Sequence, residues 1–588
     1  MNSRLKHLCW LLILCSQSLF SQSKKVVLPP NWFNLDRIES GYFGISTEKA
    51  YLELLKDKKP KQEIIVAVLD GGVDIDHEDL KQVLWTNKKE IPGNGIDDDG
   101  NGYIDDIHGW NFIGSAKGNL AYDNLELVRI YRKLRPKYRS MINSNGLDSA
   151  EMTEFILYRK VTGELGRKYD DAHETFRVLE LINKMLDSVA RVNHVQVPVM
   201  EQIEAYKPAD DEEEQVKKII RSEAKDRVDF ARFWKDMRQA YKEYDVMLKY
   251  NLNPAYDERS ALVADDYSNG NQRSYGNNDV KGPNAEHGSH VSGIIAAARN
   301  NGIGINGIAD HVKIMAIRIV PEGDERDKDV ANGIRYAVDN GARVINMSFG
   351  KNFKWNKQVV DEAVQYAAAK GVLLVHASGN DNANIDVTES YPTRYYDSKE
   401  ALAYQQKLLK DKAVLPKPKP TFNQMTGRYG ASRFNKEIPL VLDTLKFKLP
   451  HAENWIEVGA STYKDNEDLK ADFSNYGRHT VDVFAPGFMI KSTVPDSKYD
   501  DFDGTSMAAP VVSGLAALIL SYYPELNAVQ VKQIMMQSVD KVAHKVKYKN
   551  ERDESIRQNF SEICISGGVV NAYQALKLAG TYQPKAKQ

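Results

Sequence analysis

Four short segments carry residue types that together suit acyl transfer. They are residues 66–74 (VAVLDGGVD), 286–293 (EHGSHVSG), 377–380 (ASGN) and 504–510 (GTSMAAP). Acyl transfer requires a nucleophile, a base within hydrogen-bond reach, a group that orients the base, and donors for the oxyanion that develops. The segments supply a serine, a histidine, an aspartate and an asparagine for these four tasks.

Taken singly, most of these segments have an ordinary structural interpretation. A strand that ends in Asp-Gly is usually followed by a turn, and an asparagine often caps a helix. The segment 504–510 is more specific. Six of its seven residues, all except Ala509, are specified, and this combination would occur by chance in a chain of this length at a frequency on the order of 10⁻⁵.

Together the segments resemble the subtilisin-like serine peptidases (subtilases), whose catalytic residues also follow the chain order Asp, His, Ser. Shorter similarities lie between them, at 344–350 (VINMSFG), 391–392 (YP), 458–460 (VGA), 473–477 (FSNYG) and 485–487 (APG). Ser289 stands where the family usually has threonine, and it keeps the hydroxyl group. The resemblance implies a secreted serine endopeptidase that acts on protein or peptide substrates.

The resemblance also implies a role for each residue. Ser506 would attack the scissile carbonyl and form an acyl-enzyme, and His287 would take its proton. Asp70 would orient the imidazole, and the side-chain amide of Asn380 would donate to the oxyanion. An inactive scaffold that binds a partner is the alternative, but such chains usually lack one of these four residues. An unrelated α/β-hydrolase is excluded because no Gly-x-Ser-x-Gly segment occurs.

By the same resemblance, two chain segments and one further residue would bind the substrate. The substrate-binding residues would be Ser348, Phe349 and Gly350 along an extended peptide, Ala377, Ser378 and Gly379 in the other wall of the S1 pocket, and Ser390 at its floor. Pairing with the peptide backbone would be a case of β-augmentation. No acidic residue is evident at the floor, so cleavage after apolar residues is the default expectation.

The loop 94–106 (NGIDDDGNGYIDD) has the spacing of oxygen ligands in a calcium loop. An aspartate, an aspartate and an asparagine occupy positions one, three and five, and a glycine follows. The candidate ligands are Asp97, Asp99, Asn101, Tyr103, Asp105 and Asp106. Because His108 stands at position twelve, the helix-loop-helix motif is incomplete. The pattern favours structural Ca²⁺, and a solvated acidic turn is the alternative.

The chain alternates between short apolar runs and amphipathic segments. The runs 64–69, 312–320, 343–347 and 372–376 are rich in β-branched residues, as in buried parallel strands. Helical spacing covers 329–340 and 358–370, each closed by a glycine. This alternation predicts an α/β fold. The resemblance specifies a subtilisin-like three-layer sandwich with a mostly parallel central sheet.

Two segments interrupt this alternation. Residues 120–262 are charge-rich, and apolar residues recur at three- and four-residue spacing over 155–186 and 230–248. This pattern predicts an inserted α-helical hairpin. The Pro- and Lys-rich segment 394–453 is expected to be a surface insertion. The peptidase domain would then comprise 24–119 and 263–588.

The N-terminus predicts export. Arg4 and Lys6 precede the apolar run 8–14, and small polar residues follow to Ser23, as in a secretory signal peptide at 1–23. The mature protein is therefore expected to be periplasmic or secreted. The alternative is a lipid anchor through Cys15, although the preceding residue is not small. No other stretch reaches the roughly 18 consecutive apolar residues that a transmembrane helix needs.

The overall charge excludes one class of partner. The 588 residues include 79 basic and 81 acidic side chains, for a formal net charge of −2. Nucleic-acid binding would need a clustered excess of basic charge, so no nucleic acid is expected as a partner. Only Cys564 lies outside the predicted signal peptide, so no internal disulfide is expected either.

Overall fold

The computed structural model describes residues 28–224, 230–397, 449–550 and 554–582, with short pieces at 421–423, 428–430 and 447. The predicted signal peptide and most of the predicted surface insertion lie outside these residues. The chain divides into two compact units. The helical unit contains Leu120–Ala261 and Pro321–Asp324, and the sheet unit contains Pro29–Asn119, Leu262–Val320 and Glu325–Gln588.

The sheet unit is built on one nine-stranded sheet. In spatial order the strands are β14 (Asp540–Lys541), β17 (Gly568–Val569), β11 (Val483–Pro486), β10 (Trp455–Ser461), β7 (Leu373–Ala377), β6 (Val344–Met347), β1 (Ile64–Asp70), β5 (Val312–Arg318) and β2 (Gly109–Asn111). All neighbouring pairs are parallel except β14 with β17. The prediction of a mostly parallel central sheet is confirmed.

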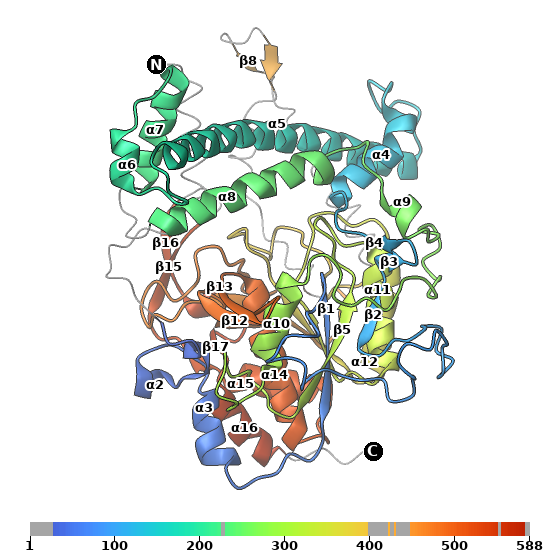
Figure 1. Cartoon of the computed structure of the whole chain (residues 1–588). Helices are drawn as coiled ribbons and strands as arrows, with labels where there is room; N and C mark the ends of the chain where they lie inside the picture. Colours follow the sequence, from blue (N-terminus) through green and yellow to red (C-terminus); the bar gives the residue numbers. More distant parts are fainter. Residues whose placement is uncertain are drawn as a thin grey trace. The chain divides into compact units, whose positions relative to one another are not determined.

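Helices cover both faces of this sheet. Figure 1 shows α11 (Asp327–Asp339) and α12 (Lys357–Ala369) on one side of β1 and β5, and α10 (Glu286–Ala296) and α14 (Thr505–Tyr522) on the other. Because side chains alternate along a strand, Ala67 and Leu69 of β1 face the α11 and α12 side and join its apolar cluster. Two further helices, α15 (Ala528–Gln537) and α16 (Ala572–Thr581), pack against α14.

Helix α14 is the most apolar element of the sheet unit. Among the described residues, it alone has the length and composition that crossing a membrane would require, but 94% of it is buried inside the molecule. Such burial is what a core helix has, and it leaves no lipid-facing surface. Every residue of α14 except Ser506 is buried.

Smaller elements complete the sheet unit. They are η2 (Trp32–Asn34), α2 (Arg37–Ser40), α3 (Thr47–Lys49), η3 (Ala50–Leu55), η6 (Phe560–Glu562), and the hairpins β3–β4 (Gly114–Ser115, Gly118–Asn119), β8–β9 (Thr421–Asn423, Arg428–Gly430), β12–β13 (Ile490–Val494, Lys498–Phe502) and β15–β16 (Lys545–Lys549, Ser555–Asn559). Helix α9 (Arg259–Leu262) ends at the junction with the helical unit.

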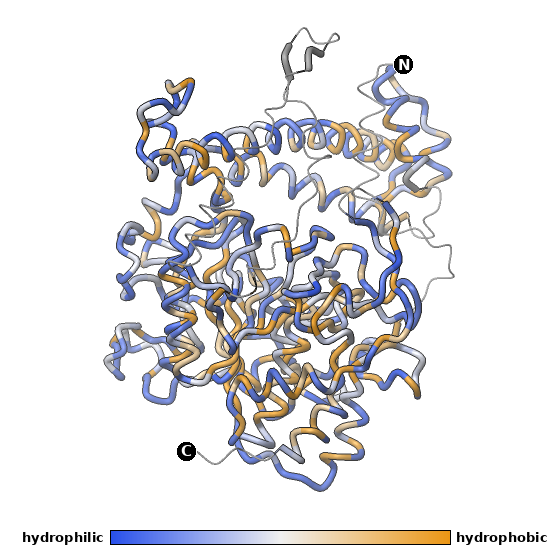
Figure 2. The backbone as a smooth tube through the Cα atoms, turned by 180° about the vertical axis from the view of Figure 1, so that it is seen from behind, coloured by the Kyte–Doolittle hydropathy of each residue, from blue (hydrophilic) through white to orange (hydrophobic). Residues whose placement is uncertain are grey.

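The helical unit contains more than two helices. These are α4 (Glu126–Tyr138), α5 (Ser149–Val192), α6 (Met200–Ala205), α7 (Asp211–Ala224), α8 (Phe230–Val246) and η4 (Met247–Asn251). Helix α5 begins at a capping box formed by Asp148 and Glu151. Hydrophobic and hydrophilic stretches alternate along it (Figure 2), and its buried residues share an apolar cluster with α6, α7 and α8. The two seams noted in the sequence lie in α5 and in α8 with the start of η4, and the prediction did not include α4, α6 and α7.

Candidate active site

The predicted catalytic residues lie at the carboxyl edge of the parallel sheet. Asp70 is the last residue of β1, and Asn380 follows the end of β7. His287 and Ser506 are the second residues of helices α10 and α14. Strand register pairs Leu69 with Met347 and Met347 with His376, so β1, β6 and β7 end at the same level. Segments far apart in the sequence therefore meet at one edge.

Asp70 and His287 form a hydrogen-bonded pair. The imidazole Nδ1 lies 2.9 Å from both carboxylate oxygens, and Asp70 is buried. Because a carboxylate only accepts, Nδ1 carries the proton and Nε2 is left as the basic nitrogen. A side chain at Gly288 would place its Cβ 2.2 Å from the carbonyl oxygen of Gly72. Glycine therefore allows α10 to begin close against the end of β1.

Ser506 lies at the N-terminus of α14, where the helix dipole favours negative charge. Pro510 has no N–H, so the Ser506 carbonyl lacks its usual partner four residues on. The Ser348 hydroxyl donates to this carbonyl at 2.9 Å instead, and the Ser506 hydroxyl donates to the Ser348 carbonyl at 3.2 Å. The proline in the motif thus creates an acceptor that ties Ser506 to the segment after β6.

Asn380 is oriented by Thr505. Its Oδ1 accepts hydrogen bonds from the Thr505 amide and hydroxyl, each at 2.9 Å, so its Nδ2 points elsewhere. A Cβ at Gly504 would lie 3.4 Å from Asn380 Nδ2 and 3.5 Å from the amide nitrogen of Ser506. Two N–H donors therefore border one small space beside Ser506, as an oxyanion site would require.

Asn475 holds the loop that carries Asn380, and the sequence did not reveal this task. Its Nδ2 donates to the Ser378 carbonyl at 2.8 Å, and its Oδ1 accepts from the amides of Asp381 and Ala383 at 3.0 and 2.8 Å. Asn475 lies within the segment 473–477, which carried the family resemblance without any role for its residues.

A chain of buried polar groups supports Ser348. Asn346, in the middle of β6, donates from Nδ2 to the Ser348 hydroxyl at 3.0 Å and accepts from the Ser513 hydroxyl at 2.8 Å. Asn346 and Ser513 are both fully buried. A polar residue inside an apolar strand was the available signal, because a buried amide needs partners.

The predicted substrate-binding residues come from adjacent segments. Residues 348–350 follow β6, and 377–379 leave the end of β7. Lys351 and Tyr391 exchange two backbone hydrogen bonds at 2.8 and 2.9 Å, which brings Ser390 beside Gly350. A Cβ at Gly350 would lie 3.7 Å from the Ser390 hydroxyl oxygen.

The second histidine of the motif has a different environment. His290 is fully buried, its ring stacks on Phe502 at 4.2 Å, and its Nε2 lies 3.1 Å from the Asp500 carbonyl oxygen. Burial lowers the pKa of His290 to about 3. It is therefore neutral, and it packs rather than reacts.

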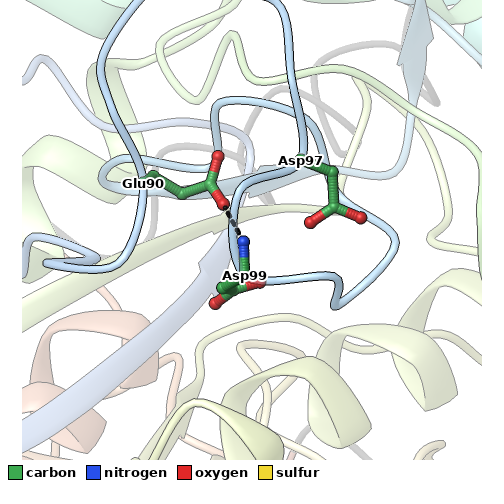
Figure 3. A group of neighbouring side chains, drawn as sticks. All are labelled: Glu90, Asp97 and Asp99. Atoms are coloured by element: carbon green, nitrogen blue, oxygen red, sulfur yellow. Dashed lines mark hydrogen bonds between the residues drawn. The ribbon is translucent and has the colours of Figure 1, made fainter.

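The acidic loop gathers three carboxylates that differ partly from the predicted set. Glu90, Asp97 and Asp99 each place an oxygen within 4.8 Å of the others (Figure 3). Glu90, which the spacing did not include, also accepts from the Asp99 amide at 3.0 Å. Carboxylates this close repel one another when ionised, and such an all-oxygen set fits Ca²⁺.

The other predicted ligands have protein partners. Asp105 accepts from the amides of Gly93 and Gly95, and Asp106 accepts from Asn87, Asn101 and Tyr336. Burial raises the pKa of Asp106 to about 6. The Tyr103 ring packs among Trp110, Phe112 and Tyr336, so only its backbone remains a candidate ligand.

Comparison with known proteins places most of the chain in one family. Residues 61–558 match the subtilase family. The chain belongs to the subtilase family. It is 33% identical over 258 residues to the thermophilic serine proteinase of Bacillus sp. (strain AK1), which covers 44% of this chain and 47% of that protein.

Two further relatives have the same kind of similarity. Thermitase of Thermoactinomyces vulgaris is 33% identical over 236 residues, 40% of this chain and 61% of its own. Subtilisin Savinase of Lederbergia lenta is 30% identical over 247 residues, 42% of this chain and 67% of its own. The chain spans about half the length of several of the curated relatives that it matches.

Proposed function

We propose that this subtilase is a serine endopeptidase that hydrolyses protein or peptide substrates through an acyl-enzyme. The observation that carries the proposal is the orientation of the site's groups. Asp70 holds His287 by Nδ1 at 2.9 Å, which leaves Nε2 as a base. Asn380 is held by its oxygen, which leaves its N–H₂ group as a donor beside Ser506.

The steps follow from these orientations. The Ser506 hydroxyl attacks the scissile carbonyl while its proton passes to His287. The oxyanion receives hydrogen bonds from Asn380 and from the Ser506 amide. His287 then gives the proton to the departing amine, and the acyl-enzyme remains. Water activated by the same imidazole releases the acid and restores Ser506.

Substrate binding prepares the nucleophile. In the free protein the Ser506 hydroxyl donates to the Ser348 carbonyl at 3.2 Å, a long distance for two oxygens. A peptide paired along 348–350 would donate its own N–H to this carbonyl and release the hydroxyl. Rotation about the serine Cα–Cβ bond would then turn the hydroxyl toward His287, so a loose arrangement in the free site is expected.

We further propose export and calcium binding. Residues 1–23 would direct the chain to the periplasm or the medium as a cleaved signal peptide, with lipidation of Cys15 as the alternative. Glu90, Asp97 and Asp99 would bind Ca²⁺, which would stabilise the loop 94–106. The support for the metal is the oxygen-only donor set within 4.8 Å.

The proposed function is tested by labelling and hydrolysis together. A fluorophosphonate probe should label the wild-type protein, and the label should map to Ser506 by mass spectrometry. Ser506→Ala should remove both labelling and peptide hydrolysis, with kcat falling by about 10⁶ as in subtilisin. A wild-type protein that is folded, unlabelled and inactive would show that this subtilase is an inactive scaffold.

A further inference from the structure

A buried histidine behind the predicted S1 pocket has no part in the triad. His376 is in β7, and its residue is 1% exposed. Strand register places it opposite Glu457 of β10. Its Nδ1 lies 2.8 Å from the Glu457 Oε1, and its Nε2 lies 3.0 Å from the carbonyl oxygen of Phe349. One side chain thus connects a buried carboxylate to the predicted substrate-binding segment, residues 348–350.

The partners of the ring determine where its protons are. A carbonyl oxygen only accepts, so Nε2 carries a proton and donates to Phe349. Nδ1 and the Glu457 carboxyl group share a second hydrogen bond at 2.8 Å, so both ring nitrogens have a partner. The other oxygen of Glu457 accepts from the Trp455 indole at 2.8 Å. The His376 and Trp455 rings pack against each other with their centroids 5.0 Å apart. The orientation of His376 is therefore fixed.

The bond from His376 reaches the edge of the substrate-binding segment that faces away from Ser506. The Ser348 carbonyl accepts from Ser506, whereas the next carbonyl, of Phe349, accepts from His376. Lys351, two residues after Phe349, pairs with Tyr391. Carbonyls that point alternately to opposite sides are a property of extended chain. His376 and Tyr391 thus occupy one edge, and the other is left for a substrate peptide.

We propose that His376, held by Glu457, is a positioning residue that fixes the substrate-binding segment for pairing with extended peptides. This inference rests on the proposed endopeptidase function. A Cβ at Gly350 would lie 3.9 Å from the His376 Nε2, so the ring also stands directly behind that segment. Because the hydrogen bond is buried, its loss should let the segment move and weaken binding of the substrate backbone.

Two substitutions that differ by one methylene separate this role from simple packing. In His376→Gln the amide nitrogen takes the place of Nε2 and still donates to Phe349. In His376→Asn the amide nitrogen takes the place of Nδ1 and pairs only with Glu457. A residue that merely fills space would tolerate both changes alike, whereas a positioning residue predicts that only His376→Gln keeps the function.

The experiment compares a tetrapeptide nitroanilide with a single-residue ester, and adds fluorophosphonate labelling of Ser506. For His376→Asn, KM for the tetrapeptide should rise about tenfold, the loss expected for one hydrogen bond, with kcat within about twofold. The ester and the labelling rate should change by less than about twofold, because neither pairs along 348–350. His376→Gln should keep the tetrapeptide KM within about threefold.

Glu457 supplies a second pair of variants. Glu457→Gln can accept from the Trp455 indole and donate to Nδ1, so a neutral ring still keeps its Nε2 proton for Phe349. Glu457→Leu cannot, and it should raise the tetrapeptide KM as His376→Asn does. This pair decides the matter if His376→Asn does not fold.

The outcomes distinguish failure of the positioning role from failure of the proposed endopeptidase function. An unchanged tetrapeptide KM in folded His376→Asn or Glu457→Leu, or a labelling rate that falls in parallel with binding, would refute the positioning role while the endopeptidase remains. A wild-type protein that neither cleaves peptides nor takes the label would refute the proposed function, and this inference with it.

Discussion

The amide of Asn380 offers the sharpest test of the proposed chemistry, because its two ends do different things. Its oxygen accepts from the Thr505 amide and hydroxyl at 2.9 Å, and its nitrogen is the candidate oxyanion donor. Asn380→Ala removes both functions. Asn380→Asp keeps the two acceptor bonds at almost the same size and replaces the donor with a carboxylate oxygen.

The magnitudes follow from these contacts. In subtilisin, removal of one oxyanion donor lowers kcat by about 10²–10³, and this measured scale is the one expected for Asn380→Ala. Because the donor acts on the transition state, KM should stay within about threefold. Asn380→Ala also removes an acceptor from the first turn of α14, which should lower the free energy of unfolding by about 1 kcal/mol. Asn380→Asp should keep that stability and lose at least as much kcat, because its charge repels the oxyanion.

The assay is steady-state hydrolysis of a tetrapeptide nitroanilide beside urea unfolding of each variant. Asn384→Ala is the matched control, since this side chain lies in the same loop and, among the described residues, accepts only from the Asp386 amide at 3.1 Å. It should leave kcat within about twofold. If Asn380→Asp is as stable as the wild-type protein and keeps more than a tenth of the wild-type kcat, Asn380 does not donate a hydrogen bond to the oxyanion.

Three further predictions concern stability and the helical unit. EDTA should lower Tm, and Ca²⁺ but not Mg²⁺ should restore it. The double substitution Glu90→Gln with Asp99→Asn should abolish this effect of Ca²⁺ on Tm, whereas the control Asp98→Asn should keep it. An effect of Ca²⁺ that survives the double substitution would place the ion elsewhere. Burial lowers the pKa of Lys470 to about 7, whereas the unfolded chain keeps this proton to about pH 10.5. Between these two pH values unfolding takes up a proton, so the free energy of unfolding rises with pH. In an inactive background, Lys470→Met should remove about 3 kcal/mol of this rise between about pH 7.5 and 9.5, measured by urea unfolding. An equal rise with and without Lys470→Met would contradict this assignment. Replacing 125–255 by a Gly/Ser linker tests the insertion. Faster hydrolysis of folded proteins, with small peptides less affected, indicates a gate, and slower hydrolysis of its own substrate indicates a docking arm. Unchanged kinetics contradict both and leave an insertion without influence on catalysis.

The sheet, and the placement of Asp70 and Ser506 at the ends of their strand and helix, could be predicted because each depends on a local signal. Asp70 ends a continuous apolar strand, and Ser506 is the second residue of an apolar helix, so both elements are recognisable within about ten residues of sequence. Parallel strands then bring their carboxyl ends to one edge without further information. The fold class accounts for the long-range contacts, so each motif needed to indicate only a local strand or helix end.

Other residues could not be predicted because their tasks depend on contacts across the sequence. Glu90 meets Asp99 through a hydrogen bond that closes the loop, and it lies outside the ligand spacing. Asn475 contacts a loop about 95 residues earlier in the chain. For such residues the sequence shows a polar side chain but not its partner, and helix or strand periodicity carries no information about it.

His376 and Glu457 show where this limit falls. They meet because β7 and β10 pair in one register, and a shift of one residue would turn one side chain to the opposite face of the sheet. Neither strand reveals that register, since both are apolar along most of their length and buried on both faces. The same pairing directs the imidazole toward Phe349, one residue after Ser348. The proposed triad is thus marked by sequence motifs, whereas the segment expected to hold the substrate depends on a register that only the folded sheet defines.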